Sequence, residues 1–145
     1  MNSVKIAIGS DHGGYELKAK IIKILEKEGF AFKDFGTLDG SPIDYPIVAK
    51  EVSLSVANGQ FDRGIIVCGS GLGVAIAANK VKGIRAVTCH DTYSAKMSRA
   101  HNNANVLTMG GRVIGDEAAF DVVRVWLNTE FEGGRHQRRV EMLED

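Results

Sequence analysis

Short apolar runs alternate regularly with longer amphipathic segments along this chain, and this alternation limits the possible folds. Helical spacing is clearest where Leu17, Ile21 and Leu25 recur at i, i+4 and i+8. Strand-like runs recur between such segments, at residues 4–9, 30–35, 64–68, 84–89 and 106–109. Strands that alternate with helices at this spacing form parallel sheets. The sequence therefore predicts an α/β fold, namely a doubly wound, five-stranded parallel sheet of the Rossmann-like kind with helices on both faces.

Turn and capping residues set the boundaries of the other predicted helices. Asp44, Tyr45 and Pro46 predict a helix start with Pro near its first position, and Asn58 with Gly59 predicts its end. Two further helices are expected at residues 74–79 and from 92 to about 101.

The last part of the chain is expected to hold two more elements. Asp116 is expected to cap a helix whose inward side chains are Phe120, Val123 and Leu127. From residue 130 the chain changes character and becomes a basic tail, expected to be helical. Its basic residues are Arg135, His136, Arg138 and Arg139.

Length and charge limit the classes of protein that fit. A chain of 145 residues predicts one domain spanning residues 1–145. The 18 Lys and Arg residues balance the 18 Asp and Glu residues, so no basic field favours nucleic acid or anionic membranes as partners. The apolar runs are too short to span a bilayer, and the N-terminus lacks the apolar region of a secretion signal. Two isolated cysteines, Cys68 and Cys89, fit reduced thiols, and a cytoplasmic location is expected.

Four polar segments follow predicted strands. The carboxyl ends of parallel strands meet at one edge of the sheet, where ligands of such folds bind. An acid, imidazoles, a thiol and an Arg among glycines favour a small anionic ligand that backbone N–H groups approach closely. The segments are Asp11-His12-Gly13-Gly14, Cys68 with Gly69-Ser70-Gly71-Leu72-Gly73, His90-Asp91 and Gly110-Gly111-Arg112.

The glycine loop that begins at Gly69 fails the spacing of common nucleotide-binding loops. A dinucleotide fingerprint needs Gly or Ala where Val74 stands, and a P-loop needs Gly-Lys-Ser or Gly-Lys-Thr where residues 79–81 read Asn-Lys-Val. Asp91 weakly resembles the ribose-binding acid of an NAD-binding domain, so that alternative stays open. A non-catalytic phosphate- or nucleotide-sensing module on the same scaffold also stays open.

Cys68 stands at the end of a predicted strand and before a helix. A lone cysteine at a strand end is usually a small buried hydrophobe, and that interpretation suffices for Cys89. At Cys68 the positive end of the following helix favours the thiolate at neutral pH. Cys68 could therefore serve as a nucleophile or a base.

Several other candidates also have purely structural explanations. Asp11 could be an N-cap and His12 a loop residue. His101, followed by Asn102 and Asn103, fits a helix C-terminus, because His favours the dipole there and Asn tolerates the left-handed conformation. The four His residues lack the spacing of metal motifs, so no metal site and no cofactor are predicted.

Six segments taken together resemble the type B ribose-5-phosphate isomerase family, which also includes galactose-6-phosphate and allose-6-phosphate isomerases. Their order and spacing make the resemblance specific across nearly the whole chain. The resemblance implies interconversion of ribose 5-phosphate and ribulose 5-phosphate in pentose phosphate metabolism, through a cis-enediol(ate) and without metal or nucleotide. The segments are Asp11-His12-Gly13-Gly14-Tyr15, Asp44-Tyr45-Pro46, Cys68-Gly69-Ser70-Gly71-Leu72-Gly73, His101-Asn102-Asn103-Ala104-Asn105-Val106, Gly110-Gly111-Arg112 and the tail with Arg135 and Arg139.

The resemblance also implies roles for the matching residues. Cys68 would be the base that moves a proton between C2 and C1, and Asp11 and His101 would assist opening of the furanose ring. The developing oxyanion would be held by Ser70 and by the N–H groups of Gly69, Gly71, Leu72 and Gly73. The residues assigned to substrate binding are Tyr45, Asn102 for a sugar hydroxyl and, chiefly for the phosphate, His12, Arg112, Arg135 and Arg139.

The expected distance between His101 and Cys68 conflicts with a shared role in one chain, and this conflict predicts an oligomer. The helix that begins near Thr92 runs away from the carboxyl edge by about 1.5 Å per residue. His101 should therefore lie far from Cys68 in the same chain, and a second subunit would bring it to the site. We expect a homodimer or a dimer of dimers with active sites shared between subunits, as the resemblance also implies.

Ser70 departs from the family pattern, because many members carry Thr at this position. The smaller side chain leaves a roomier pocket, so activity on six-carbon aldoses or their phosphates is a further hypothesis. Isomerisation of allose 6-phosphate or galactose 6-phosphate stays an alternative to that of ribose 5-phosphate.

Overall fold

A parallel sheet forms the centre of the molecule in a computed structural model that describes residues 3–144. Its strands lie in the order β2-β1-β3-β5-β4, and each neighbouring pair is parallel. The predicted five-stranded α/β fold is therefore confirmed. The strands are β1 (Lys5–Ser10), β2 (Ala31–Gly36), β3 (Arg63–Cys68), β4 (Ala86–Thr88) and β5 (Val106–Gly110).

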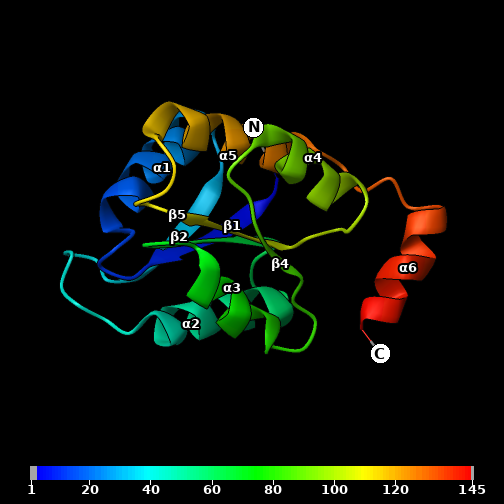
Figure 1. Ribbon diagram of the computed structural model, residues 1–145, viewed down its shortest axis with the longest axis horizontal. Coiled ribbons are helices and arrows are strands. Elements are labelled where there is room, and N and C mark those ends of the chain that lie inside the picture. Colours follow the sequence, from blue (N-terminus) through cyan, green and yellow to red (C-terminus); the bar gives the residue numbers. More distant parts are fainter. Residues whose placement is uncertain (1–2, 145) are drawn as a thin grey trace.

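Helices cover both faces of this sheet (Figure 1). The helices α1, α4 and α5 lie on one face, α2 and α3 lie on the other, and α6 stands apart from both layers. Among residues 3–144, no helix is long and apolar enough to cross a membrane. The helices are α1 (Tyr15–Lys27), α2 (Tyr45–Ala57), α3 (Leu72–Asn79), α4 (Thr92–Ala100), α5 (Asp116–Asn128) and α6 (Arg135–Leu143), so the predicted helical tail is present.

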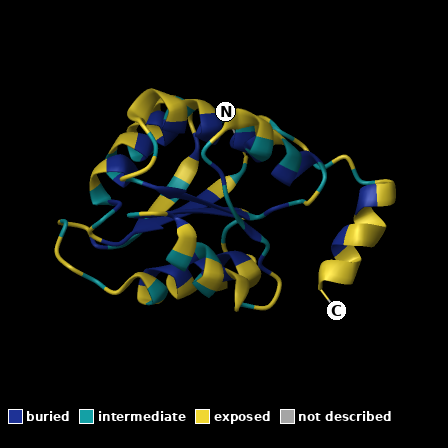
Figure 2. Ribbon diagram, in the orientation of Figure 1, coloured by how far each residue is buried: buried dark blue, intermediate teal, exposed yellow. Residues whose placement is uncertain are grey.

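The two faces of the sheet pack into separate apolar cores. One core includes Ile8, Ile65 and Trp126, and the other includes Val48 and Ile66, all fully buried. All six residues of β3 are buried, because successive side chains of this central strand enter opposite cores. Figure 2 shows the same division, with a buried sheet and exposed outer faces on the helices.

The strand order explains where a ligand can bind. The chain leaves β1 for β2 on one side and later returns to β3 on the other side of β1. A crevice forms at the carboxyl ends of strands where the winding reverses in this way. Asp11 follows β1 and Cys68 ends β3, so both lie at this reversal.

The predicted strand over residues 84–89 is too long. The Ile84 N–H donates to the carbonyl of Val81 at 3.2 Å in a turn, and the Arg85 N–H donates to the Asn105 side chain at 2.8 Å. These two N–H groups are therefore taken before the ladder begins, so β4 starts at Ala86, and it ends at Thr88.

The start of α5 also differs from the prediction. Gly115 is the N-cap, with φ −75° and ψ 160°, and Asp116 is the first helical residue. The Asp116 carboxylate pairs with Lys20 Nζ at 2.6 Å and so joins α5 to α1. An acid in the first turn still favours the helix dipole, but it does not cap the helix.

The inner face of α5 was predicted only in part. Val123 and Leu127 are buried as expected, whereas Phe120 is half-buried. Trp126, which the analysis of the pattern did not single out, is fully buried. The core-facing stripe therefore runs one position away from Phe120.

Candidate active site

Loops that follow β1, β3 and β5 meet at the carboxyl edge of the sheet, as the sequence predicts. Glycines let their backbones approach closely. A Cβ on Gly14 would overlap the carbonyl of Val67, and one on Gly110 would lie 2.7 Å from the carbonyl oxygen of Ser70. A larger residue at either position would force these loops apart.

Cys68 ends β3 and is 5% exposed. Its Sγ accepts a hydrogen bond from the Gly71 N–H at 3.1 Å. Gly71 has a φ of 80°, and this left-handed conformation turns the chain into α3. An N–H donor and a helix N-terminus both stabilise a thiolate. The geometry is thus compatible with the hypothesis that Cys68 is a base or nucleophile.

Two threonine hydroxyls anchor Gly71. Thr108 Oγ1 lies 2.8 Å from the Gly71 carbonyl oxygen, Thr88 Oγ1 lies 3.1 Å from it, and the two hydroxyls are 2.8 Å apart. Sequence analysis missed both residues, because only the pairing of β4 with β5 sets Thr88 beside Thr108. They hold the residue whose N–H reaches Cys68.

Two predicted oxyanion donors are already engaged within the loop. The Gly71 N–H donates to Cys68 Sγ, and the Leu72 N–H donates to Ser70 Oγ at 3.2 Å. A substrate oxygen that used either donor would have to compete with these side chains. The loop therefore has a resting arrangement of its own, with the Leu72 side chain exposed.

These loops border a cleft of about 520 Å³. The Arg112 guanidinium covers Gly69, where a Cβ would lie 3.1 Å from Nη1, and the Tyr45 ring packs against Gly73. The cleft thus brings together a carboxylate, a thiol, a hydroxyl and a guanidinium from the predicted set. Its lining residues are Asp11, Tyr45, Cys68, Gly69, Ser70, Gly73, Arg112 and Val113.

The first loop carries the two remaining candidates of this edge. Asp11 is 8% exposed, and its carboxylate accepts the Gly14 N–H at 3.2 Å. The N-cap of α1 is Gly14, so the structural alternative for Asp11 was wrong in position. His12 is exposed, and its Nδ1 accepts the Ile43 N–H at 3.4 Å. His12 thus lies beside the segment that leads to α2.

The loop after β5 is held from two sides. The Gly110 N–H donates to His90 Nε2 at 2.9 Å, and the Arg112 N–H donates to the carbonyl of Gly69 at 3.0 Å. His90, which the sequence places at this edge, therefore supports the segment that carries Arg112. It does not line the cleft.

The other predicted residues gather elsewhere. His101, Asn102 and Arg139 line a second cleft of about 260 Å³, and Arg135 begins α6 as an exposed residue. His101 is the C-cap of α4, at the end of that helix remote from the carboxyl edge. The two clefts share no lining residue, so one chain does not bring His101 to Cys68.

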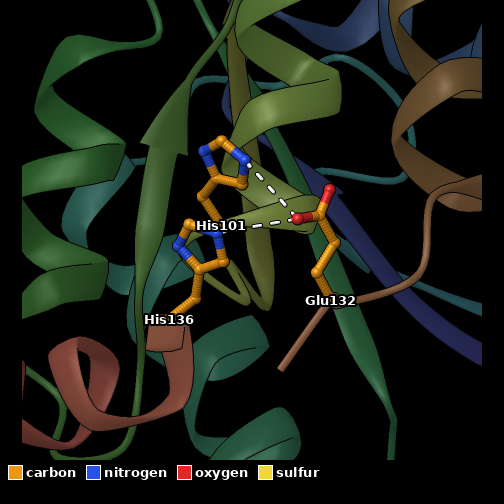
Figure 3. Close-up of side chains that lie close together, drawn as sticks. All are labelled: His101, Glu132 and His136. Atoms are coloured by element: carbon orange, nitrogen blue, oxygen red, sulfur yellow. Dashed lines mark ion pairs between the residues drawn. The ribbon is translucent and has the colours of Figure 1, made fainter. Parts of the chain in front are cut away.

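A further cluster lies beside the second cleft (Figure 3). The rings of His101 and His136 are stacked, with centroids 4.1 Å apart and 10° between their planes. Their Nε2 atoms lie 3.8 and 3.6 Å from Glu132 Oε1. Burial lowers the pKa of His136, and the charges of His101 and Arg135 lower it further. The absence of a metal-motif spacing hid this grouping, because His101 is far from the other two in sequence.

The second thiol is buried in the apolar core. Cys89 is 2% exposed, and burial raises its pKa to about 11. It is therefore protonated at neutral pH and behaves as the small hydrophobe that the sequence predicts.

Comparisons with known proteins agree on one family. A model of the Ribose/Galactose Isomerase family matches residues 6–143. The chain is 50% identical to the ribose-5-phosphate isomerase B of Escherichia coli over 96% of this chain and 93% of that protein. It is 44% identical to the D-erythrulose-4-phosphate isomerase of Pectobacterium atrosepticum over 97% and 93%. A solved structure of Clostridium thermocellum ribose-5-phosphate isomerase B matches with a TM-score of 0.95 and 52% identity, over 97% and 95% of the two chains. The chain therefore belongs to the ribose/galactose isomerase family and is an isomerase with its α/β fold.

Proposed function

We propose that the protein interconverts ribose 5-phosphate and ribulose 5-phosphate. The observation that carries this proposal is the position of Cys68, whose sulfur accepts the Gly71 N–H in a cleft that Arg112 also lines. The cleft thus combines a candidate base with donors for an oxyanion and a cation for a phosphate. Relatives named ribose-5-phosphate isomerase B, at 46% and 50% identity, support the same substrate.

The reaction moves a proton between neighbouring carbons of the open-chain sugar. The Cys68 thiolate removes the proton from C2, the C–H electron pair forms the C1–C2 double bond, and the carbonyl electrons move onto O1. Return of the proton to C1, with transfer of the hydroxyl proton from O2 to O1, gives ribulose 5-phosphate and restores the thiolate. The intermediate is a cis-enediolate, and no metal or nucleotide takes part.

Stabilisation of the enediolate falls to the glycine loop. A general base typically supplies about 10²–10⁴-fold, so it needs help with a weakly acidic carbon. Each well-aimed oxyanion donor is worth about 10²–10³-fold. Ser70 and the N–H groups of residues 69–73 are the proposed donors, and those of Gly71 and Leu72 would turn from Cys68 and Ser70 to the substrate as it binds.

The phosphate and the sugar ring need further residues. Each charge-assisted hydrogen bond to a phosphate contributes about 1.5–3 kcal/mol. We assign the phosphate chiefly to His12, Arg112, Arg135 and Arg139, because Arg112 and Arg139 line the two clefts, Arg135 begins α6 and His12 follows Asp11 at the carboxyl edge. Asp11 and His101 would open the furanose ring. Tyr45 and Asn102 would contact the sugar.

The separation of the two clefts supports a site shared between subunits. Cys68 lies at the carboxyl edge of the sheet, whereas His101 lies at the far end of α4. The helix α6 lies outside the two helix layers and packs beside His101 through His136 (Figure 1). We propose a homodimer, or a dimer of dimers, in which His101, Asn102 and α6 of one copy complete the Cys68 cleft of another.

Mixing two inactive variants tests the shared site. Unfolding and refolding Cys68→Ala with His101→Ala in equal amounts should restore about a quarter of wild-type activity, because half of the dimers are mixed and each has one intact site. Each variant refolded alone is the control. No recovery from well-folded mixed dimers would place both residues in one chain's site and refute the sharing.

The substrate is tested with purified protein, excess EDTA and no added nucleotide. We expect ribose 5-phosphate to give a higher kcat/KM than allose 6-phosphate, galactose 6-phosphate or D-erythrulose 4-phosphate. A higher value for one of the others would replace the proposed substrate. Tight binding of sugar phosphates or nucleotides without turnover would favour the sensing module. A role in cytoplasmic pentose phosphate metabolism stays a prediction.

Ser70 is the proposed source of a broader substrate range. Its hydroxyl oxygen accepts the Leu72 N–H at 3.2 Å, and Thr at this position would add a methyl group beside it. We expect Ser70→Thr to raise the ratio of pentose to hexose kcat/KM. An unchanged ratio would contradict this explanation.

A further inference from the structure

Three potential metal ligands lie close together at the C-terminal end of α4. One nitrogen or oxygen from each of His101, Glu132 and His136 lies within 4.8 Å of the others. Both Nε2 atoms point toward the same carboxylate oxygen, at 3.8 and 3.6 Å, and the parallel rings present them side by side (Figure 3). The three donor atoms therefore lie close together, but the lone pairs of the two parallel rings do not converge on one point in this arrangement.

These distances are close to those of a bound zinc ion. Zinc bonds of about 2.1 Å in a tetrahedral site place neighbouring ligand atoms about 3.4 Å apart. The two N–O separations exceed this value by only a few tenths of an ångström. Because an imidazole binds a metal in its own plane and the two ring planes are nearly parallel, one ring, such as the partly exposed His101, must turn out of the stack to share the ion. Two His and one Glu form a three-ligand zinc set that leaves the fourth position open.

The backbone holds the three ligands in place. His101 is the C-cap of α4, and the Glu132 N–H donates to the carbonyl of Ala100 at 3.0 Å. His136 lies in the first turn of α6 and is 7% exposed. The backbone positions are therefore preformed, and the turn of one ring is the main change that binding requires.

The surroundings select the kind of ion. The second cleft, which His101 and His136 line, has room for a water as fourth ligand. Arg139 lines the same cleft and Arg135 precedes His136. The positive charges of these two side chains disfavour any cation that is bound only by electrostatic attraction. Imidazole ligands suit zinc and its transition-metal neighbours, whereas magnesium and calcium prefer oxygen.

We propose that His101, Glu132 and His136 bind a divalent transition-metal ion, best matched by Zn²⁺, and that the bound ion inhibits the isomerase by withdrawing His101 from the sugar. The inhibitory consequence rests on the proposed function. The binding itself does not.

Binding is tested in the full chain carrying Cys68→Ala and Cys89→Ala, which removes both thiols as competing ligands. Calorimetric titration with Zn²⁺, and visible absorption with Co²⁺ as a spectroscopic substitute, should show one tetrahedral ion per chain. Adding Glu132→Gln should weaken the affinity at least about tenfold, and His136→Gln at least as much. Glu130→Gln, an exposed acid of the same segment, is the matched control and should bind as before.

Inhibition is tested in the chain with both thiols present. Micromolar Zn²⁺ should slow ribose 5-phosphate conversion reversibly with EDTA, and Glu132→Gln should need about tenfold more zinc for the same inhibition. Each variant is compared with its own metal-free rate. Equal inhibition of Glu132→Gln would assign the effect to Cys68 and overturn the inhibitory claim.

The other outcomes separate the two proposals. No zinc binding, or binding that Glu132→Gln leaves unchanged, overturns the metal site. Zinc bound at the cluster without loss of activity overturns inhibition alone. No isomerisation by the metal-free protein refutes the proposed function, while the thiol-free titration still decides whether the metal site exists.

Discussion

Replacing Thr108 with Val removes one hydroxyl and leaves a side chain of nearly the same volume. Thr108 is fully buried, and its Oγ1 is 2.8 Å from the Gly71 carbonyl oxygen and 2.8 Å from Thr88 Oγ1. The two hydroxyls have only two protons for the three contacts among these oxygens. Thr108 donates to Gly71, and Thr88 donates either to Thr108 or to Gly71.

The cost of Thr108→Val follows from this arrangement. The variant loses the shorter bond to Gly71, and Thr88 can replace it only from 3.1 Å. Losing one partner of a buried polar group costs about 1–3 kcal/mol. Thr88→Val keeps the shorter bond, so it should cost about 0.5–1.5 kcal/mol, the net value of one ordinary hydrogen bond.

The same substitution should slow the reaction. Gly71 would be free to move, and its N–H would no longer be aimed steadily at Cys68. Loss of a direct oxyanion donor costs about 10²–10³-fold, so loosening one donor should lower kcat about tenfold and leave KM for ribose 5-phosphate nearly unchanged. Thr88→Val should have the smaller effect.

Urea unfolding at one fixed protein concentration and steady-state kinetics measure both quantities. The concentration must be fixed because subunit association changes apparent stability. A Thr108→Val protein with wild-type stability and kcat would refute the idea that these hydroxyls position Gly71. An increase in KM alone would show that they act on substrate binding instead.

Three further predictions concern the scaffold. Lys18→Met removes the buried ion-pair partner of Asp34, whose carboxylate lies 2.7 Å from Lys18 Nζ, and should lower the free energy of unfolding in urea by roughly 2–4 kcal/mol. The exposed Lys20→Met should change this free energy little. Equal effects would contradict the role of burial. Because the pKa of Cys89 is raised from 9.0 to about 11, the folded state keeps a proton that the unfolded state loses. Stability should therefore fall by at most about 2 kcal/mol as pH rises from about 9 to 11, and Cys89→Ala should remove that part of the pH dependence. Gly14→Ala, whose Cβ would overlap Val67, should lower the urea midpoint more than Gly115→Ala, which also changes an N-cap glycine but places its Cβ in open space.

The layers and the edge of the sheet that holds the site were predictable because local patterns specify them. Strand-like runs between helical segments predicted all five strands, and the carboxyl-edge rule brought Asp11, Cys68 and Arg112 to one cleft. The predicted left-handed cap after His101 is also present, since Asn103 has a φ of 49°. Each of these features depends on residues close in sequence or on parallel pairing alone.

The features that were missed depend on contacts between distant residues. Thr88 and Thr108 lie 17 and 37 residues from Gly71, and only strand order sets them around its carbonyl. The cluster of His101, Glu132 and His136 forms because the segment after α5 returns to the end of α4. Side-chain patterns report which face of an element is buried, but they do not report which distant side chains meet there.

The proposed mechanism rests on one claim, that the Cys68 thiolate carries the proton between C2 and C1. The most direct measurement is kcat for ribose 5-phosphate conversion by Cys68→Ala, with excess EDTA and with Cys89→Ala as the matched control. We predict a loss of about 10²–10⁴-fold in Cys68→Ala. Cys89→Ala should stay near the wild-type rate. A folded Cys68→Ala protein that keeps more than about a tenth of the wild-type kcat would contradict the claim and assign the proton transfer to another group.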